Sequence, residues 1–95
     1  MASIRNLKKD VEYLVFEVVS DCYAHEEVRP GKHSAELTDI IEDAVQLRND
    51  LYRRINGESA TVEPADRKKL FSAIRKDLFS GIDNLFDRLS KLTKN

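Results

Sequence analysis

The sequence has few of the residues that break helices or cross-link chains. Among its 95 residues are three glycines, two prolines, one cysteine and no tryptophan. A β-rich fold of this length needs more turn residues, so their scarcity argues against one. The single cysteine, Cys22, has no partner for an internal disulfide, which is compatible with a reducing compartment. With 41% hydrophobic residues, the chain is also too apolar to be disordered.

Long apolar runs are also missing. A helix that spans a bilayer needs roughly 20 apolar residues. The longest apolar run here, from Tyr13 to Val19, is far shorter and includes Glu17. The first residues of the chain lack the apolar segment and the cleavage site of an export signal. We therefore expect a cytoplasmic protein that has no membrane partner.

Three segments carry apolar residues at spacings of three and four, which is the pattern of amphipathic helices. These predicted helices cover residues 3–28, 34–56 and 64–93. Their apolar stripes are Ile4, Leu7, Val11, Leu14, Val15, Val18 and Cys22; then Leu37, Ile40, Ile41, Ala44, Leu47, Leu51 and Ile55; then Phe71, Ile74, Leu78, Ile82, Leu85, Leu89 and Leu92. Because short loops make neighbouring helices antiparallel, the sequence predicts one all-α domain over residues 1–95, an up-down-up three-helix bundle.

Three residues predict helix ends, and a fourth, Gly81, concerns the middle of the third helix. Ser34 is placed to accept a hydrogen bond at the start of the second helix, and Pro64 suits the first turn of the third. Gly57 suits the left-handed position that closes the second helix. Gly81 allows either a kink, which would produce a four-helix variant, or a close approach between two helices.

The best metal-binding candidate is a group around Cys22 and His25. Asp21 and Glu26 adjoin them, and His33 lies across the first loop. A closed zinc site needs four ligands, and a second cysteine is absent. Cys22 lies on the apolar stripe, where a thiol is usually inert. We therefore interpret it as a packing residue and expect no metal, no cofactor and no catalytic activity.

Arg48 is unusual because it falls inside the apolar arc of the second predicted helix. Two interpretations stay open. Its aliphatic stem could cover the edge of the core while the guanidinium reaches water. Alternatively, it could form a buried pair with a carboxylate that fixes the helix register, or anchor an interface in an oligomer.

Charge is distributed unevenly along the chain. Residues 1–47 hold five bases against ten acids, whereas residues 48–95 hold eleven bases against seven acids. Three regions would meet at one end of the predicted bundle and form a basic end that could bind an anion or a partner. Its candidate residues are Arg53, Arg54, Arg67, Lys68 and Lys69. Three of these, residues 67–69, lie where cations disfavour a helix start, which hints at selection for another purpose.

The helices carry more apolar residues than one stripe each. The surplus forms second rows that a three-helix monomer would not cover, and a large exposed apolar patch usually marks a partner site. The candidate interface residues are Phe16, Val19, Tyr23, Val45, Tyr52, Phe79 and Phe86. We therefore expect a protein–protein interaction or assembly module that forms a homodimer.

The alternative is a nucleic-acid-associated accessory protein that uses the basic end. Its net charge of −1 and the lack of exposed aromatic residues among the basic ones argue against it. The Pro30-Gly31 break and the helix start at residues 63–66 (Glu-Pro-Ala-Asp) give a general look that resembles small helical-bundle proteins of bacteria. The resemblance covers architecture alone and implies no functional residues.

Overall fold

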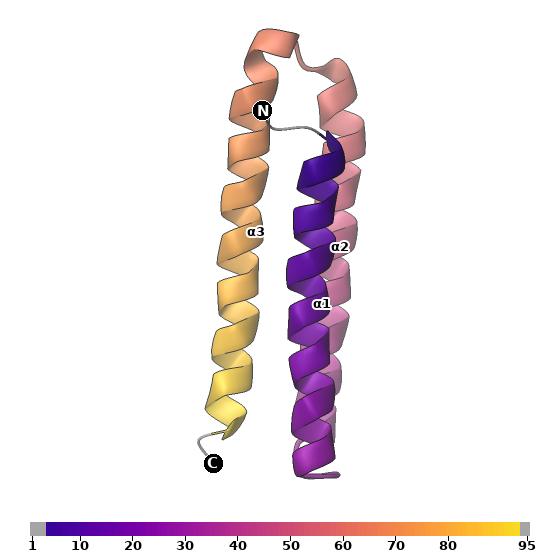
Figure 1. Cartoon of the computed structure of the whole chain (residues 1–95), viewed down its shortest axis with the longest axis vertical. Coiled ribbons are helices and arrows are strands. Elements are labelled where there is room, and N and C mark those ends of the chain that lie inside the picture. The colour runs from indigo at the N-terminus through magenta and orange to yellow at the C-terminus, as the bar shows by residue number, and fades with distance from the viewer. Residues whose placement is uncertain (1–3, 94–95) are drawn as a thin grey trace.

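The structure is a computed structural model that describes residues 4–93, except for the side chain of Ser59. Its three helices are α1 (Ile4–Val28), α2 (Ser34–Thr61) and α3 (Pro64–Thr93). Neighbouring helices are antiparallel and form a rod of 49 × 18 × 17 Å, in which α1 runs down, α2 up and α3 down in the view of Figure 1. The described residues contain no strand. The predicted all-α three-helix bundle is confirmed, while the expected start of the first helix at residue 3 lies outside the described residues.

One continuous core runs along the axis, and each helix contacts both others. The predicted stripes supply it, because residues three and four apart share a helix face. Fully buried side chains include Leu7 and Val18 of α1, Ile55 of α2, and Phe71 and Leu78 of α3. Burial of each such side chain contributes about 1.5–3 kcal/mol. The free thiol of Cys22 belongs to this core.

The predicted end of the second helix at residue 56 is wrong. α2 continues for five more residues to Thr61, and the C-cap residue Val62 donates its backbone N–H to the carbonyl of Glu58 at 3.1 Å. Gly57 lies within the helix and does not adopt the left-handed conformation. The four residues that follow Gly57 include no proline, so nothing in the local sequence forces the helix to stop there.

α3 is unbroken from Pro64 to Thr93, so the four-helix variant does not occur. Gly81 instead marks the close approach of α3 to α2. A methyl group added to its Cα would lie 2.8 Å from Cδ2 and 3.0 Å from Cδ1 of Leu47. The absence of a side chain at residue 81 therefore lets Leu47 pack against the α3 backbone.

The turn between α1 and α2 is organised by Glu26. Its Oε1 accepts hydrogen bonds from the Gly31 backbone N–H at 3.0 Å and from the Ser34 hydroxyl at 2.8 Å. Gly31 has a φ of 77°, a conformation that suits glycine. The expected cap at Ser34 is wrong, because His33 is the N-cap residue and makes no side-chain cap hydrogen bond. The Ser34 hydroxyl points to Glu26 instead.

Arginine–carboxylate pairs join all three helix pairs at the edges of the core. They are Glu12–Arg48 between α1 and α2, Asp10–Arg75 between α1 and α3, and Arg54–Asp77 and Asp43–Arg88 between α2 and α3. Their shortest N–O distances lie between 2.6 and 2.9 Å. Partly exposed pairs of this kind contribute less than about 1 kcal/mol each, so they tune the helix register more than the overall stability.

Candidate protein interaction surface

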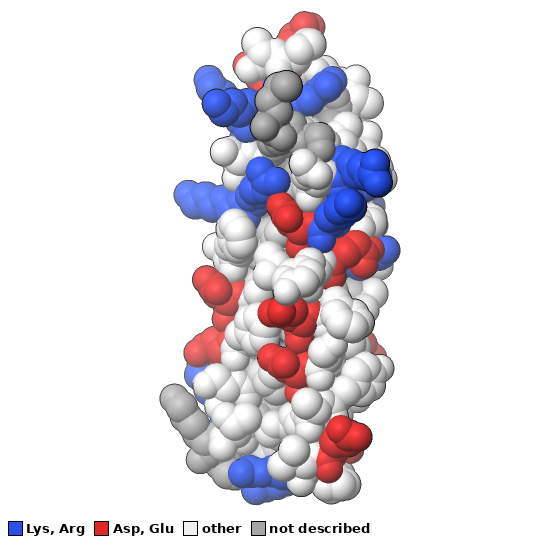
Figure 2. Space-filling view, viewed as in Figure 1, with Lys and Arg blue, Asp and Glu red and all other residues white. Residues whose placement is uncertain are grey.

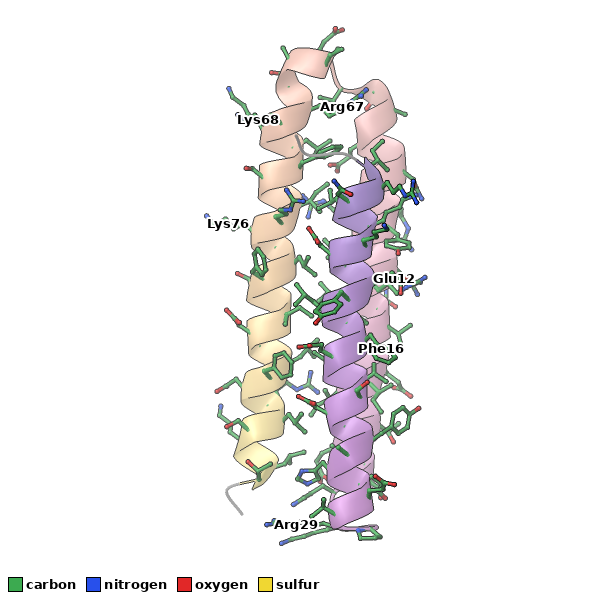
Figure 3. The ribbon with its side chains drawn as sticks, viewed as in Figure 1. Glu12, Phe16, Arg29, Arg67, Lys68 and Lys76 are labelled. Carbon is green, nitrogen blue, oxygen red and sulfur yellow. The ribbon has the colours of Figure 1, made fainter. Side chains whose placement is uncertain are left out.

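Three aromatic side chains of α1 are exposed on the side of the helix that faces away from the core. Tyr13, Phe16 and Tyr23 have exposed fractions of 66, 68 and 64%. At 100° per residue they fall within an arc of about 80°, roughly opposite the buried stripe of Val11, Val15 and others. We call these three residues the aromatic face. Figure 3 shows Phe16 projecting from α1 on the side away from α3.

The seven predicted interface residues divide into two groups. Phe16, Tyr23, Val45 and Phe79 are exposed. The other three, Val19, Tyr52 and Phe86, are partly buried because they pack against the bundle's own core. A protein interface that uses this set must therefore rely mainly on the exposed four.

Tyr13 is not among the predicted interface residues, because it was considered only as the first residue of the apolar run that ends at Val19. Its spacing of three residues from Phe16 and ten from Tyr23 is helical, and that spacing could have identified it.

A polar cluster borders the aromatic face on the α2 side. Oε1 of Glu12 accepts hydrogen bonds from Nε of Arg48 at 2.6 Å and from the Tyr52 hydroxyl at 2.7 Å. The Arg48 guanidinium lies over the Tyr52 ring, 4.5 Å from its centroid, which adds a cation–π attraction. Arg48 forms a pair between α1 and α2, but the pair is not buried, because the Arg48 and Glu12 side chains are 36% and 50% exposed. The partly exposed guanidinium therefore agrees with the first of the two interpretations left open by the sequence.

The cluster shifts the protonation equilibria of its members. Hydrogen bonds from Arg48 and Tyr52 stabilise the Glu12 carboxylate and lower its pKa. Burial, followed by the hydrogen bond to Glu12, raises the pKa of Tyr52 to about 12. The hydrogen bond to Glu12 also raises the pKa of Arg48. At neutral pH the cluster therefore holds an ionised Glu12–Arg48 pair and a neutral phenol.

The five residues predicted at the basic end lie in the last part of α2 and the first turns of α3, and Arg53 and Arg54 are among those that form ion pairs within the molecule. Arg53 pairs with Asp50 at 3.4 Å, and Arg54 pairs with Asp77 at 2.6 Å. Residues 67–69 at the start of α3 are exposed. In the view of Figure 2 most basic side chains lie in the upper part and most acidic ones in the middle and lower parts, although acidic atoms also lie at the upper tip and basic ones at the lower end. Figure 3 shows Lys68 and Arg67 near the upper end and Arg29 at the opposite one.

A surface cavity of about 740 Å³ lies beside the aromatic face, where Arg5, Lys8 and Lys9 of α1 are close to Tyr13 and Phe16. It is lined by Arg5, Lys8, Lys9, Asp10, Glu12, Tyr13, Phe16 and Tyr52. The expectation that exposed aromatic residues are absent from the basic region is therefore wrong.

The Cys22–His25 group shows no metal-binding geometry. Among residues 4–93, no three histidine, cysteine or acidic side chains converge on a common point. Cys22 is 1% exposed, and burial followed by the nearby Asp21 charge raises the pKa of its thiol. The His25 and His33 rings lie 5.5 Å apart and are tilted by 48°. The burial of Cys22 supports its interpretation as a packing residue.

Within the described residues, no helix combines the length and the apolarity needed to cross a membrane. The chain matches no protein-family model, and neither a curated protein nor a solved structure shows significant similarity to it.

Proposed function

We propose that this chain is a cytoplasmic protein–protein interaction module that self-associates as a homodimer through the aromatic face of α1. The observation that carries the proposal is the exposure of Tyr13, Phe16 and Tyr23 on one side of a single helix. Aromatic side chains dominate interface energetics because they bury a large area at a small entropic cost. Leaving three of them in water on one face is costly unless a partner covers them.

The bundle itself does not need the aromatic face. The α1 side of the core is complete without it, since Leu7, Val11, Val15, Val18 and Cys22 are buried by α2 and α3. The three exposed rings lie on the opposite side of α1 and contribute little to that packing. This separation distinguishes a partner surface from apolar residues that merely extend the core.

Light scattering coupled to size-exclusion chromatography tests the proposal over a range of concentrations. We expect wild type to have twice the chain mass of 10.9 kDa. Phe16→Asp should shift it to the monomer mass with an unchanged helical circular dichroism spectrum. Phe79→Asp is the matched control, because Phe79 is 53% exposed but lies on α3. A monomeric wild type at the highest concentration, or an equal loss in both variants, would overturn the assignment.

A second candidate function is binding of single-stranded nucleic acid at the cavity. The observation that favours it is the position of Tyr13 and Phe16 beside Arg5, Lys8 and Lys9. Aromatic rings that stack bases, together with cations that contact phosphates, are the common elements of such sites. Against it stands the net charge of −1, which weakens long-range attraction of a polyanion.

Fluorescence anisotropy of a labelled oligothymidine separates this candidate from self-association. Binding should fall steeply between about 50 and 200 mM salt. Lys8→Glu should abolish it, while Arg29→Glu, at the opposite end of the molecule, should not (Figure 3). An absence of binding at low salt would remove the candidate.

A further inference from the structure

The outer side of α1 carries a row of six residues that can pair favourably with the same six residues of a second, antiparallel copy. Its residues recur at spacings of four and three, which is the heptad pattern of a helix–helix contact. In chain order they are Lys9, Tyr13, Phe16, Ser20, Tyr23 and Glu27. We call these six residues the outer seam. None of them belongs to the buried core.

From these positions we infer that two copies pair antiparallel along the outer seam, with Lys9 of each copy against Glu27 of the other. This inference rests on the proposed self-association and specifies its geometry. A two-fold axis at the level of residue 18 relates position 9 to 27, 13 to 23 and 16 to 20, because each pair is equidistant from the axis. Such an isologous contact uses the same patch on both copies and is the commonest way to form a dimer.

Each pairing is chemically favourable. Lys9 meets Glu27 as opposite charges at both ends of the seam, and both residues are exposed in the bundle. Tyr13 meets Tyr23, which allows aromatic contact. Phe16 meets Ser20, a small side chain that leaves room for the ring. From position 9 to position 27 the seam extends about 27 Å at 1.5 Å per residue.

Other arrangements of the same two helices are disfavoured. In a parallel dimer Lys9 would face Lys9 and Glu27 would face Glu27, and such like-charge contacts select against a partner. Sliding the antiparallel partner by one heptad in either direction leaves two of the six residues without a seam partner. The antiparallel register centred on residue 18 therefore pairs all six residues and both signs of charge.

Charge reversal at the two ends of the seam tests the register. Sedimentation velocity should show that Lys9→Glu and Glu27→Lys each raise the dimer dissociation constant at least tenfold. The double variant should return it to near the wild-type value. Mixing the two single variants should produce a heterodimer, because a chain that is acidic at both ends of its seam then faces a chain that is basic at both ends.

A control reversal, Glu36→Lys on α2, alters charge outside the seam and should leave the dissociation constant unchanged. Phe16→Asp should disrupt any dimer that uses this face, whatever its register. If that variant is monomeric but the charge reversals have no effect, the register is wrong and the proposed function stands. A monomeric wild type overturns both. The pairing is overturned if the single variants form dimers as tight as those of wild type, or if their mixture stays monomeric. Self-association that requires an added oligonucleotide would also overturn it.

Discussion

The two helical glycines should respond differently to the same substitution. Gly57 lies inside α2, and a methyl group there would meet no atom within 4 Å. Gly81 lies inside α3, where the methyl group would meet Leu47 at 2.8 Å. Alanine favours a helix over glycine by about 1 kcal/mol in both places. The difference between the sites is therefore steric.

Gly57→Ala should raise the free energy of unfolding by about 0.5–1 kcal/mol. At Gly81 the same gain is opposed by crowding, because the terminal methyl carbons of the partly buried Leu47 must move away from the added group. Overpacking costs about 1–3 kcal/mol where the neighbouring side chain cannot shift freely. Gly81→Ala should therefore be neutral or destabilising by up to about 2 kcal/mol. In a Leu47→Ala background the crowding is absent, and Gly81→Ala should recover its helical gain of about 1 kcal/mol.

Urea unfolding followed by circular dichroism measures all of these variants, and the double-mutant cycle isolates the contact between residues 47 and 81. If Gly81→Ala stabilises as much as Gly57→Ala in both backgrounds, the close approach of α2 and α3 is refuted. If Gly57→Ala instead destabilises by about 1–2 kcal/mol, residue 57 adopts the left-handed conformation and α2 ends there.

Two further predictions concern titratable groups. The pKa of Glu12 is lower in the folded protein, so its pair with Arg48 stabilises the fold above the ordinary carboxyl value of 4.5 and loses that effect as pH falls through the folded pKa. Glu12→Gln should therefore reduce the free energy of unfolding by at most about 1 kcal/mol at pH 7. In urea titrations at acid pH the difference between the variant and wild type should become smaller. A difference that stays constant with pH would contradict this prediction. Cys22 is buried and its thiol pKa is raised, so a maleimide should label native protein on the order of 100-fold more slowly than protein in denaturant. Comparable labelling rates would show that Cys22 is accessible.

The spacing of the apolar residues predicted the three-helix architecture, because the burial of these residues determines how the helices pack. The stripe from Phe71 to Leu92 repeats at three and four residues without interruption, and Gly81 removes no backbone hydrogen bond that α3 needs. The break that Gly81 also allowed was a local alternative that packing against Leu47 outweighs. The end of α2 was predicted less well, because Gly57 carries only a weak preference of about 1 kcal/mol that the adjoining helical turn overcomes.

The polar network was not predictable from one helix at a time. Glu12 lies on the solvent side of the α1 stripe, and nothing local indicates that Arg48, 36 residues away, will reach it. The same holds for Asp10 and Arg75, which are 65 residues apart. Such pairs depend on helix rotation and vertical register, which are set by core packing and cannot be read from spacing within a helix. Tyr13, in contrast, was within reach of the periodicity argument.

α1 carries two apolar rows on opposite sides, and they have separable consequences. The inner row, represented by Leu7 and Val18, is fully buried and contributes to the stability of the monomer. The outer row, represented by Phe16 and Tyr23, is about two-thirds exposed and gains nothing comparable from folding. A substitution such as Phe16→Asp therefore exchanges apolar surface for charge without opening a cavity in the core. If the outer row exists for a partner, association is lost while the melting temperature of the monomer stays near its wild-type value, an outcome that no residue of the inner row can produce.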